Sequence, residues 1–379
     1  MRAIVIGGGV IGAAVAYRLA QAGTRVVPVE AGRIAEGTSL TSFAWVSACE
    51  KIDSESYYRL SLAGVAAHRQ LAAEMQTHPA WYHTPGVIQW LDAGYEGLAL
   101  SESPLELKLA RLHALGYPAE AIGPAELRRL EPGLHAEALG ASGKAIHYPR
   151  DGYVEAPLMI AALIETAIER YGMELRCHAP VRRVLTSGGR AAGVEIADGQ
   201  VIEADAVINC AGRWANDVVG DPALEIPLAP TLGLIAYTAP VGTAIRKVLR
   251  TPNLNLRPDG GGRILLRAND LDEMLTGSDL ATPDHPVARD LALRLGQLVP
   301  SLSGIGVEAA RIAVRPIPGD GLPCVGQIPG VDNYWVAVTH GGINTSAFIG
   351  LVLREEILDG RPAAEYAPYR PDRFFKAAA

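Results

Sequence analysis

The first thirty residues combine two short apolar runs with one amphipathic segment. Ala3 to Ile6 is apolar and rich in β-branched residues, as expected of a buried parallel strand. Apolar residues then recur at helical spacing as far as Ala22, and Gly23 follows where a helix commonly ends. A second apolar run, 26–29, leads to Glu30. The pattern predicts a strand, a helix and a second strand.

The rest of the chain predicts further helices and strands. Helical spacing covers 54–76, 104–115, 123–130, 155–171, 286–298 and a last segment from 341 to 358, which Gly360 caps. Short apolar or alternating runs predict strands within 79–90, 140–148, 174–178, 181–186, 191–196, 201–204, 206–212 and 334–339. Strand-like runs and turns alternate over 226–267, which indicates an antiparallel sheet, and 311–326 is extended and interrupted by prolines. We therefore expect an α/β protein with two lobes of different kinds.

A glycine-rich turn joins the first strand to the first helix. Gly7, Gly9 and Gly12 form G-x-G-x-x-G, in which the first glycine allows a sharp turn and the second a close approach of a pyrophosphate. The third lets the helix pack against the strand. The helix begins at Val10 and Ile11, where free N–H groups and the positive end of the helix dipole favour phosphates.

Glu30 lies about 20 residues further on, where an acidic side chain accepts hydrogen bonds from a ribose diol. Ala31 begins a polar turn in which Thr38 and Ser39 can donate hydroxyl hydrogen bonds to phosphates or to a ring system. A plain helix cap followed by core aromatics explains this turn equally well. The whole unit predicts a dinucleotide site. A glycine-rich helix entry without a ligand and a secretory signal are the alternatives, and the glycines and the short apolar stretch argue against the signal.

Composition and charge exclude several classes of function. The 379 residues are 49% hydrophobic and 20% charged, which suits a large core. The net charge of −7, with basic residues singly or in short pairs, argues against nucleic-acid binding. No apolar run is long enough to span a bilayer, so we expect a soluble, cytoplasmic protein. Four widely spaced cysteines, Cys49, Cys177, Cys210 and Cys324, predict reduced thiols with neither a metal site nor a disulfide framework.

Seven motifs together resemble the D-amino-acid oxidase superfamily of flavoenzymes, which includes glycine oxidase, monomeric sarcosine oxidase and the D-amino-acid dehydrogenases. They are Val5–Gly12, Glu30 with Gly37–Ser39, Tyr148–Glu155, Ala206–Trp214, Val314–Pro316, Asp320–Pro323 and Thr339–Gly342. The resemblance covers nearly the whole chain and implies FAD. Relatives with covalent flavin carry a cysteine in the C-terminal region, and because Cys324 falls a few residues beyond that position we expect non-covalent FAD.

The resemblance also implies the domain organisation. A Rossmann-type FAD-binding domain would comprise residues 1–78, 150–222 and 311–370. An α+β substrate-binding domain on an antiparallel or mixed sheet would comprise 79–149 and 223–310.

The same resemblance implies cofactor roles. The glycines and Glu30 would hold the ADP half, Val181 to Val184 would pass the adenine, and Gly212 would close on the cofactor from a neighbouring strand. Gly341, Gly342, Ile343 and Asn344 begin the last helix, whose N–H groups would stabilise the negative charge of a reduced flavin. A glycine turn before a core helix is the alternative interpretation.

Arg315 is the expected substrate ligand, because its counterpart in glycine oxidase and related enzymes grips the substrate carboxylate. A planar guanidinium binds a carboxylate through two parallel hydrogen bonds. A structural ion pair is the alternative for Arg315, and Arg267 and Arg257 are weaker candidates for the same role. His340, next to the last helix, is the second catalytic candidate.

The implied reaction is oxidation of the C–N bond of a D-amino acid, glycine or an N-alkyl amino acid to an imine, by hydride transfer to flavin N5. The electrons would pass to O₂ or to another acceptor. The main alternative is a flavin subunit of a multi-subunit amine or opine-type dehydrogenase. A tRNA-modifying module and a nicotinamide dehydrogenase are further alternatives, and the sequence leaves a homo- or hetero-oligomer open.

Overall fold

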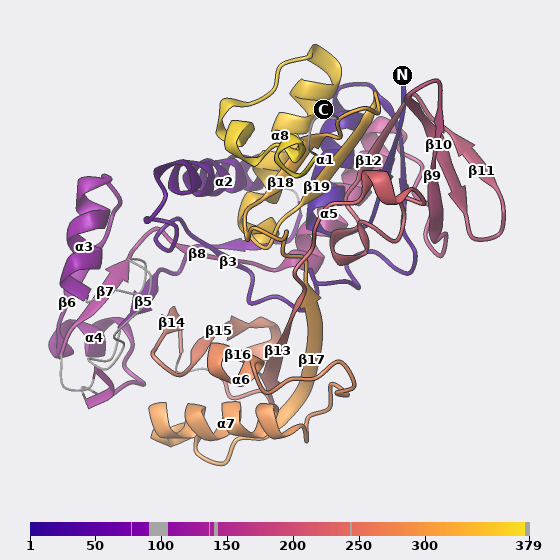
Figure 1. Ribbon diagram of the computed structural model, residues 1–379. Coiled ribbons are helices and arrows are strands. Elements are labelled where there is room, and N and C mark those ends of the chain that lie inside the picture. Colours follow the sequence, from indigo (N-terminus) through magenta and orange to yellow (C-terminus); the bar gives the residue numbers. More distant parts are fainter. Residues whose placement is uncertain (77, 91–104, 136, 140–142, 243–244, 376–379) are drawn as a thin grey trace.

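The structure is a computed structural model that describes residues 1–76, 78–90, 105–135, 137–139, 143–242 and 245–375. Figure 1 shows an upper part that contains both termini and a lower part built on a second sheet, joined by long extended segments. Within the described residues no helix has both the length and the apolarity needed to cross a membrane.

The upper part is built on a five-stranded sheet of order β18-β19-β12-β1-β2. Four of these strands are parallel, and β18 is an antiparallel edge strand. Uninterrupted apolar runs form the inner strands because both faces of the sheet are covered. The strands are β1 (Arg2–Ile6), β2 (Arg25–Val29), β12 (Ala206–Asn209), β18 (Cys324–Gln327) and β19 (Tyr334–Val338).

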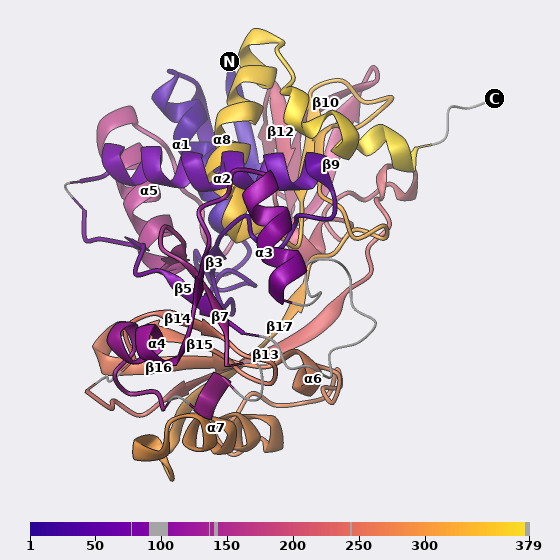
Figure 2. The ribbon, with the colours of Figure 1, turned by 90° about the vertical axis from the view of Figure 1, so that its left-hand side faces the viewer.

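Helices cover one face of this sheet and a small sheet covers the other. Helix α1 (Val10–Gln21) packs between α5 (Ala156–Tyr171) and α8 (Gly342–Asp359), and α2 (Glu55–Glu74) packs on α8. Figure 2 shows this helical layer from the side. The opposite face holds the antiparallel strands β9 (Val181–Ser187), β10 (Arg190–Ile196) and β11 (Val201–Glu203). Each face has its own apolar core.

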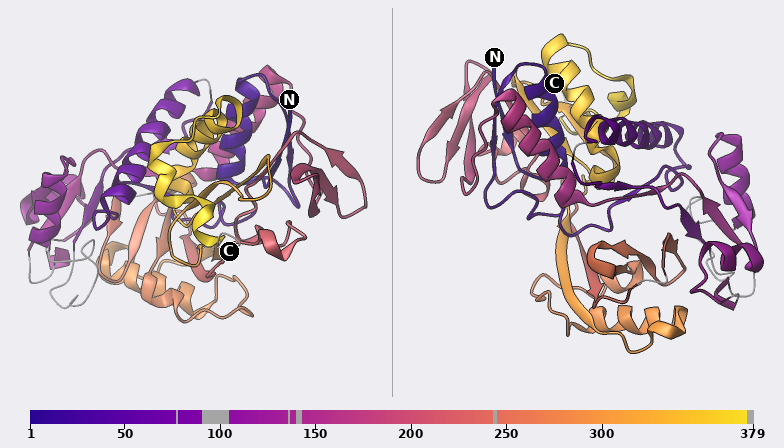
Figure 3. Two further views of the ribbon diagram at one scale, coloured as in Figure 1. Left: turned by 45° about the horizontal axis from the view of Figure 1, so that its top comes forward. Right: turned by 180° about the vertical axis from the view of Figure 1, so that it is seen from behind.

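The lower part is an eight-stranded sheet of order β17-β13-β16-β15-β14-β5-β7-β6. Its pairs are antiparallel except β14 with β5, so the sheet is mixed. The strands are β5 (Val87–Gln89), β6 (Glu120–Ile122), β7 (Ala145–Tyr148), β13 (Thr231–Thr238), β14 (Val248–Arg250), β15 (Asn255–Asp259), β16 (Arg263–Arg267) and β17 (Val307–Arg315). Helix α7 (Pro286–Leu298) packs on this sheet, as Figure 3 shows from behind.

Shorter elements complete the fold. A three-stranded sheet of order β3-β8-β4 consists of β3 (Trp45–Val46), β4 (Tyr82–His83) and β8 (Gly152–Val154). The remaining α-helices of the described residues are α3 (Leu105–Ala114), α4 (Pro124–Leu130) and α6 (Asn269–Asp272). Short 3₁₀ helices lie at Gly212–Trp214, Pro222–Leu224, Gly260–Gly262, Pro300–Leu302, Ala364–Tyr369 and Pro371–Phe374.

Most predicted elements are present, and three predictions need correction. The segment 174–178 is not a strand, because only Arg176 makes a single bridge with Val29. The segment 79–90 holds two short strands, since Gly86 turns the chain at a φ of +91°. The stretch 311–326 is not one extended element, because its first residues end β17 and its last begin β18. The predicted starts at 104 and 140 lie outside the described residues.

Candidate active site

A cavity of about 490 Å³ lies where β1 ends and α1 begins. Almost every residue predicted to bind the ADP half of the cofactor lines it, from four separate segments of the chain. They are Gly7, Gly9, Val10, Ile11, Glu30, Ala31, Thr38, Ser39, Val181 and Gly212. The exception among the glycines of the motif is Gly12.

The three motif glycines have different structural roles. Gly7 has a φ of +104°, and a Cβ there would lie 2.7 Å from the Cys210 carbonyl oxygen. A Cβ at Gly12 would lie 1.9 Å from the Gly7 oxygen, so this position serves close packing. At Gly9 the backbone is extended, and a Cβ would meet only the Ser39 hydroxyl oxygen, at 3.0 Å. Only Gly9 keeps room free for a ligand without being required by the fold.

Glu30 and Ser39 are held at this cavity by backbone N–H groups. The Glu30 carboxylate accepts from the N–H groups of Gly8 (2.6 Å) and Gly32 (2.9 Å). Ser39 Oγ accepts from the Val10 N–H at 3.1 Å, which leaves its own hydroxyl proton available to a phosphate. Thr38 instead donates its hydroxyl to the Val314 carbonyl at 2.9 Å, so it joins the two parts of the molecule.

A second cavity, of about 500 Å³, lies between the start of α8 and the eight-stranded sheet. It shares Val10, Thr38, Ser39 and Pro316 with the first cavity, so one long ligand can extend through both. The predicted residues His340, Gly341, Gly342, Ile343 and Asn344 line one side, and Arg267 and Arg315 also line it.

The start of α8 presents backbone N–H groups to this cavity. Gly341 is the N-cap, and the next three N–H groups, from Gly342 to Asn344, have no acceptor within the helix. The Asn344 side chain is already paired, because it accepts from the Ser47 N–H (3.0 Å) and donates to the Ser61 carbonyl (3.1 Å). Its side chain therefore anchors the helix, and its backbone N–H is the group that the start of the helix offers to a cofactor.

Arg315 and Arg267 share one carboxylate. Arg315 Nη2 pairs with Oδ2 of Asp272, and Arg267 Nη2 lies 3.1 Å from the same oxygen. The other oxygen of Asp272 accepts from the Leu234 N–H at 2.9 Å. The ion-pair alternative for Arg315 is thus present in the structure. One carboxylate nevertheless neutralises only one of two guanidinium groups, so this triad keeps a positive charge beside the cavity.

His340 lies beside these cations. Desolvation is the largest cause that lowers the pKa of its imidazole to about 4, followed by the charges of Arg315, Lys51 and Arg267. The side chain is exposed, yet the surrounding protein removes part of the hydration that a charged ring would need. His340 is therefore neutral at neutral pH.

Arg257, a weaker candidate for carboxylate binding, does not line this cavity. Its side chain is buried, donates to the Phe43 carbonyl at 2.8 Å and pairs with Asp259 at 3.0 Å. It lines a different cavity, near Arg311. The structure therefore brings Arg267, and not Arg257, to Arg315.

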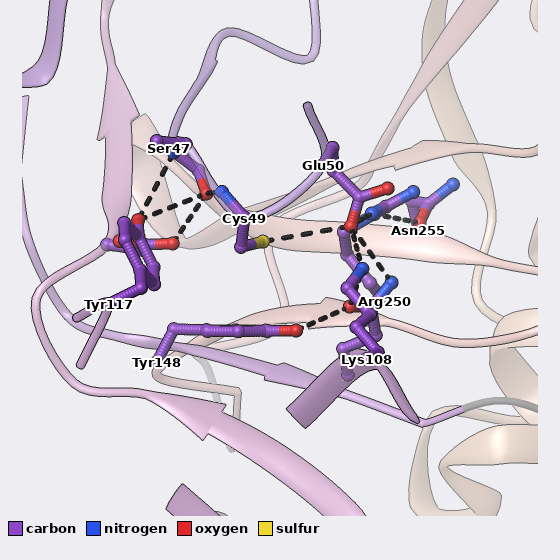
Figure 4. A network of polar contacts seen from close by, with 11 residues as sticks. Ser47, Cys49, Glu50, Lys108, Tyr117, Tyr148, Arg250 and Asn255 are labelled. Atoms are coloured by element: carbon purple, nitrogen blue, oxygen red, sulfur yellow. Dashed lines mark hydrogen bonds and ion pairs between the residues drawn. The ribbon is translucent and has the colours of Figure 1, made fainter. Parts of the chain in front are cut away.

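A second charged triad in the cavity wall was not predicted. Glu50 lies between Arg250 (2.6 Å) and Lys108 (2.5 Å), as Figure 4 shows. Burial favours a higher pKa of Glu50, but the two cations outweigh it and lower the pKa to about 2. These residues belong to none of the motifs. The one signal in the sequence is Arg250 itself, a charged residue that ends a short apolar run.

Comparisons with known proteins decide the family. Residues 2–356 match the family model described as FAD dependent oxidoreductase. The chain belongs to this family of FAD-dependent oxidoreductases, within the D-amino-acid oxidase superfamily. The FAD-dependent oxidoreductase is 28% identical over 387 residues to a glycine oxidase of Pseudomonas aeruginosa, with 98% of each chain covered.

Two further comparisons bear on the oxidoreductase. The crystal structure of glycine oxidase from Geobacillus kaustophilus matches with a TM-score of 0.84 and 24% identity, over 100% of both chains. A hydrogen cyanide synthase subunit of Pseudomonas protegens is 28% identical over 256 residues, which cover 67% of this chain and 59% of that one. The predicted α/β fold with a Rossmann-type FAD-binding domain is confirmed, and so is FAD as cofactor.

The residues present fit FAD. The first cavity has a glycine position open to a pyrophosphate and a fixed carboxylate at the end of β2, as an adenosine diphosphate requires. The second cavity adjoins it and offers the N–H groups of α8. The ADP half would thus lie against Gly9 and Glu30, and the flavin ring against Gly342 and Ile343.

Proposed function

We propose that this oxidoreductase oxidises the C–N bond of an amino acid or an N-alkyl amino acid to an imine. The observation that carries the proposal is the second cavity, where the N-terminus of α8 and the guanidinium groups of Arg315 and Arg267 line one space. That space adjoins the cavity of the dinucleotide motif. The names of relatives such as glycine oxidase support the same class of substrate.

The bound FAD supplies a hydride acceptor. The protein's part is to bind and orient the substrate. Arg315 and Arg267 together keep one uncompensated positive charge, which suits one carboxylate. Two parallel hydrogen bonds to that carboxylate would fix the direction of the Cα–H bond.

His340 and α8 complete the electrostatics. The neutral imidazole of His340 adds no cation that would repel a substrate amine. The N–H groups of Gly342 and Ile343, at the positive end of the α8 dipole, favour negative charge on the cofactor side of the cavity. We therefore infer a positioning role for His340 and no proton transfer from an imidazolium.

The electron acceptor divides two candidate functions. In an oxidase O₂ takes the electrons, whereas in a dehydrogenase subunit a partner does. The similarity to a hydrogen cyanide synthase subunit favours the second candidate. A cytoplasmic location, non-covalent FAD, the domain boundaries and the absence of nucleic-acid binding remain predictions from the sequence.

Anaerobic mixing of the purified holoenzyme with D-amino acids, L-amino acids and N-methyl amino acids tests the proposal. We expect at least one class to bleach the flavin absorption, and peroxide on readmission of air if O₂ is the acceptor. Bleaching by none of the three classes contradicts the proposed function. Bleaching without peroxide favours the dehydrogenase subunit.

A further inference from the structure

Two charged triads of the same design border the second cavity, which is lined by Arg315 and Arg267 of one triad and by Glu50 and Arg250 of the other. In each, one carboxylate lies between two cations: Asp272 between Arg315 and Arg267, and Glu50 between Arg250 and Lys108. Asp272 and Lys108 are buried, at 6% and 0% exposure, while Arg315, Arg267 and Arg250 are 20%, 24% and 15% exposed. Each triad therefore keeps one positive charge, with an arginine at the cavity.

The register of the sheet places the two triads side by side. Arg250 on β14 pairs directly with Asn255 on β15, and Asn255 pairs directly with Arg267 on β16. Residues opposite one another in register share a face of the sheet, so both arginines belong to the same face. Two strand spacings separate their backbones, which is about 10 Å. The guanidinium groups are thus within reach of two ends of one small molecule.

The charge balance of the cavity is strongly positive. Among the described residues that line it, Glu50 is the single acid, against Lys51, Arg250, Arg267 and Arg315. Cations withdrawn from water without an equal number of anions destabilise a fold. One substrate carboxylate compensates the triad of Arg315 and leaves that of Arg250 uncompensated. A second anionic group would compensate it.

The hydrogen bonds around Arg250 fit an acceptor ligand. Its Nε donates to the side-chain oxygen Oδ1 of Asn255 at 3.2 Å, which leaves the NH₂ group of the same amide as a donor at this place in the wall. Arg250 also lies over the Trp45 ring, 4.4 Å from its centroid, so its guanidinium is held in place. Donors that are fixed before binding favour a carboxylate over a neutral group.

We propose that the substrate is an amino acid with a second carboxylate, held by Arg250 and Asn255 while Arg315 and Arg267 hold the first. The second carboxylate belongs either to an acidic side chain or to an N-carboxyalkyl substituent, which share the same chemistry. The inference rests on the proposed function, because it concerns the substrate of the same cavity.

Pairs of substrates that differ only in one charge test the inference. Anaerobic flavin reduction is measured with glutamate against glutamine, in both enantiomers, and with N-(carboxymethyl)glycine against N-(carbamoylmethyl)glycine. We expect the dicarboxylate of at least one pair to reduce the flavin with a ratio of reduction rate constant to apparent Kd (kred/Kd) at least about tenfold higher than its amide, as a charge-assisted hydrogen bond implies. The pair with the larger ratio identifies the acidic side chain or the N-substituent. Equal values within both pairs, or no bleaching by these compounds while another amino acid bleaches the flavin, overturn the inference and leave the proposed function intact. Bleaching by no amino acid of any class contradicts the proposed function itself.

Two variants separate charge from contact. Arg250→Gln and Lys108→Met each leave the second triad neutral, and Lys108 has no exposed surface with which to contact a substrate. We expect both to lower kred/Kd for the dicarboxylate toward the level of its amide, and Lys108→Met, which does not touch the substrate, to keep the value for the amide. FAD content and thermal unfolding verify the fold of each variant. A well-folded Lys108→Met enzyme that keeps the full preference contradicts the inference.

Discussion

Asp272 pairs with Arg315, so the guanidinium for which the sequence predicts a substrate role has a carboxylate partner within the protein. Asp272 also faces Arg267 and accepts from the Leu234 N–H, which fixes its position. The pair is therefore both a structural ion pair and one part of a site with a net positive charge. Substitution of Arg315 and substitution of Asp272 should therefore have different effects, the first on substrate binding and the second on stability.

Substitution of Arg315 should weaken substrate binding. We expect Arg315→Met to raise KM by roughly 10- to 150-fold, since charge-assisted hydrogen bonds contribute about 1.5–3 kcal/mol. Arg311→Met is a matched control, because Arg311 lies on the same strand but does not line this cavity. Steady-state kinetics with the best substrate provide the measurement. An unchanged KM for Arg315→Met would remove the anchoring role.

Substitution of Asp272 should destabilise the fold. Asp272→Asn leaves two guanidinium groups without a counter-ion, and we expect unfolding in urea to lose about 1–3 kcal/mol. Glu308→Gln is the control, because it breaks an exposed pair with Arg263 at 2.8 Å, which contributes about 0–1 kcal/mol. Equal losses in the two variants would show that the Asp272 pair has no special structural role.

The glycine motif predicts two distinguishable defects. Gly12→Ala places a Cβ 1.9 Å from the Gly7 oxygen, so we expect a loss of stability of about 3 kcal/mol or more. Gly9→Ala meets only the Ser39 hydroxyl, so the protein should fold but carry less FAD. Circular dichroism and the ratio of flavin to protein absorbance measure the two effects. A Gly9→Ala protein with a full complement of FAD would contradict the assigned pyrophosphate contact.

His68 should make stability depend on pH. It is fully buried and contacts the Ile343 carbonyl at 2.7 Å, and desolvation lowers the pKa of its imidazole to about 4. In the unfolded chain the histidine has a pKa of about 6.5 and binds a proton below that pH, whereas the folded protein does not. The free energy of unfolding therefore falls as the pH decreases from 6.5 to 4. The loss approaches about 3 kcal/mol for this single group.

Comparison with His68→Asn isolates that contribution. Asp151 and Glu131 have raised pKa values, of about 6 and 7, and therefore destabilise the fold as the pH rises through the acidic range. Both are common to the two proteins and cancel in the difference. Urea unfolding from pH 4 to 7 should show that the stability advantage of the wild type shrinks toward low pH. A constant difference would contradict a neutral, buried His68.

The nucleotide-binding half could be predicted because its signals are local. Gly7, Gly9 and Glu30 lie within one strand–helix–strand unit, and each residue type follows from the shape of the ligand. Residues 174–178 were misjudged for the same local reason, because an alternating run does not reveal how far pairing with a neighbouring strand extends. The Glu174 and Arg176 N–H groups donate to β2, but only Arg176 forms a bridge.

The substrate side could be predicted only in part. Arg315 belongs to a motif, but its partner Asp272 is 43 residues away, and Glu50 and Arg250 are brought together by the packing of distant segments. No periodicity or spacing marks such pairs. Asn344 illustrates a different gap, because its position was predicted while the binding of its side chain to Ser47 and Ser61 depends on how α2 and α8 pack.

The need for a substrate carboxylate is measured by anaerobic flavin reduction, in which an amino acid is compared with the same amine without its carboxylate. We expect saturable bleaching by the amino acid, with kred/Kd at least about tenfold above that of the amine, because Arg315 and Arg267 bind a carboxylate. Bleaching by the amine with equal or greater kred/Kd, or no bleaching by any amino acid tried, would contradict carboxylate binding at this site.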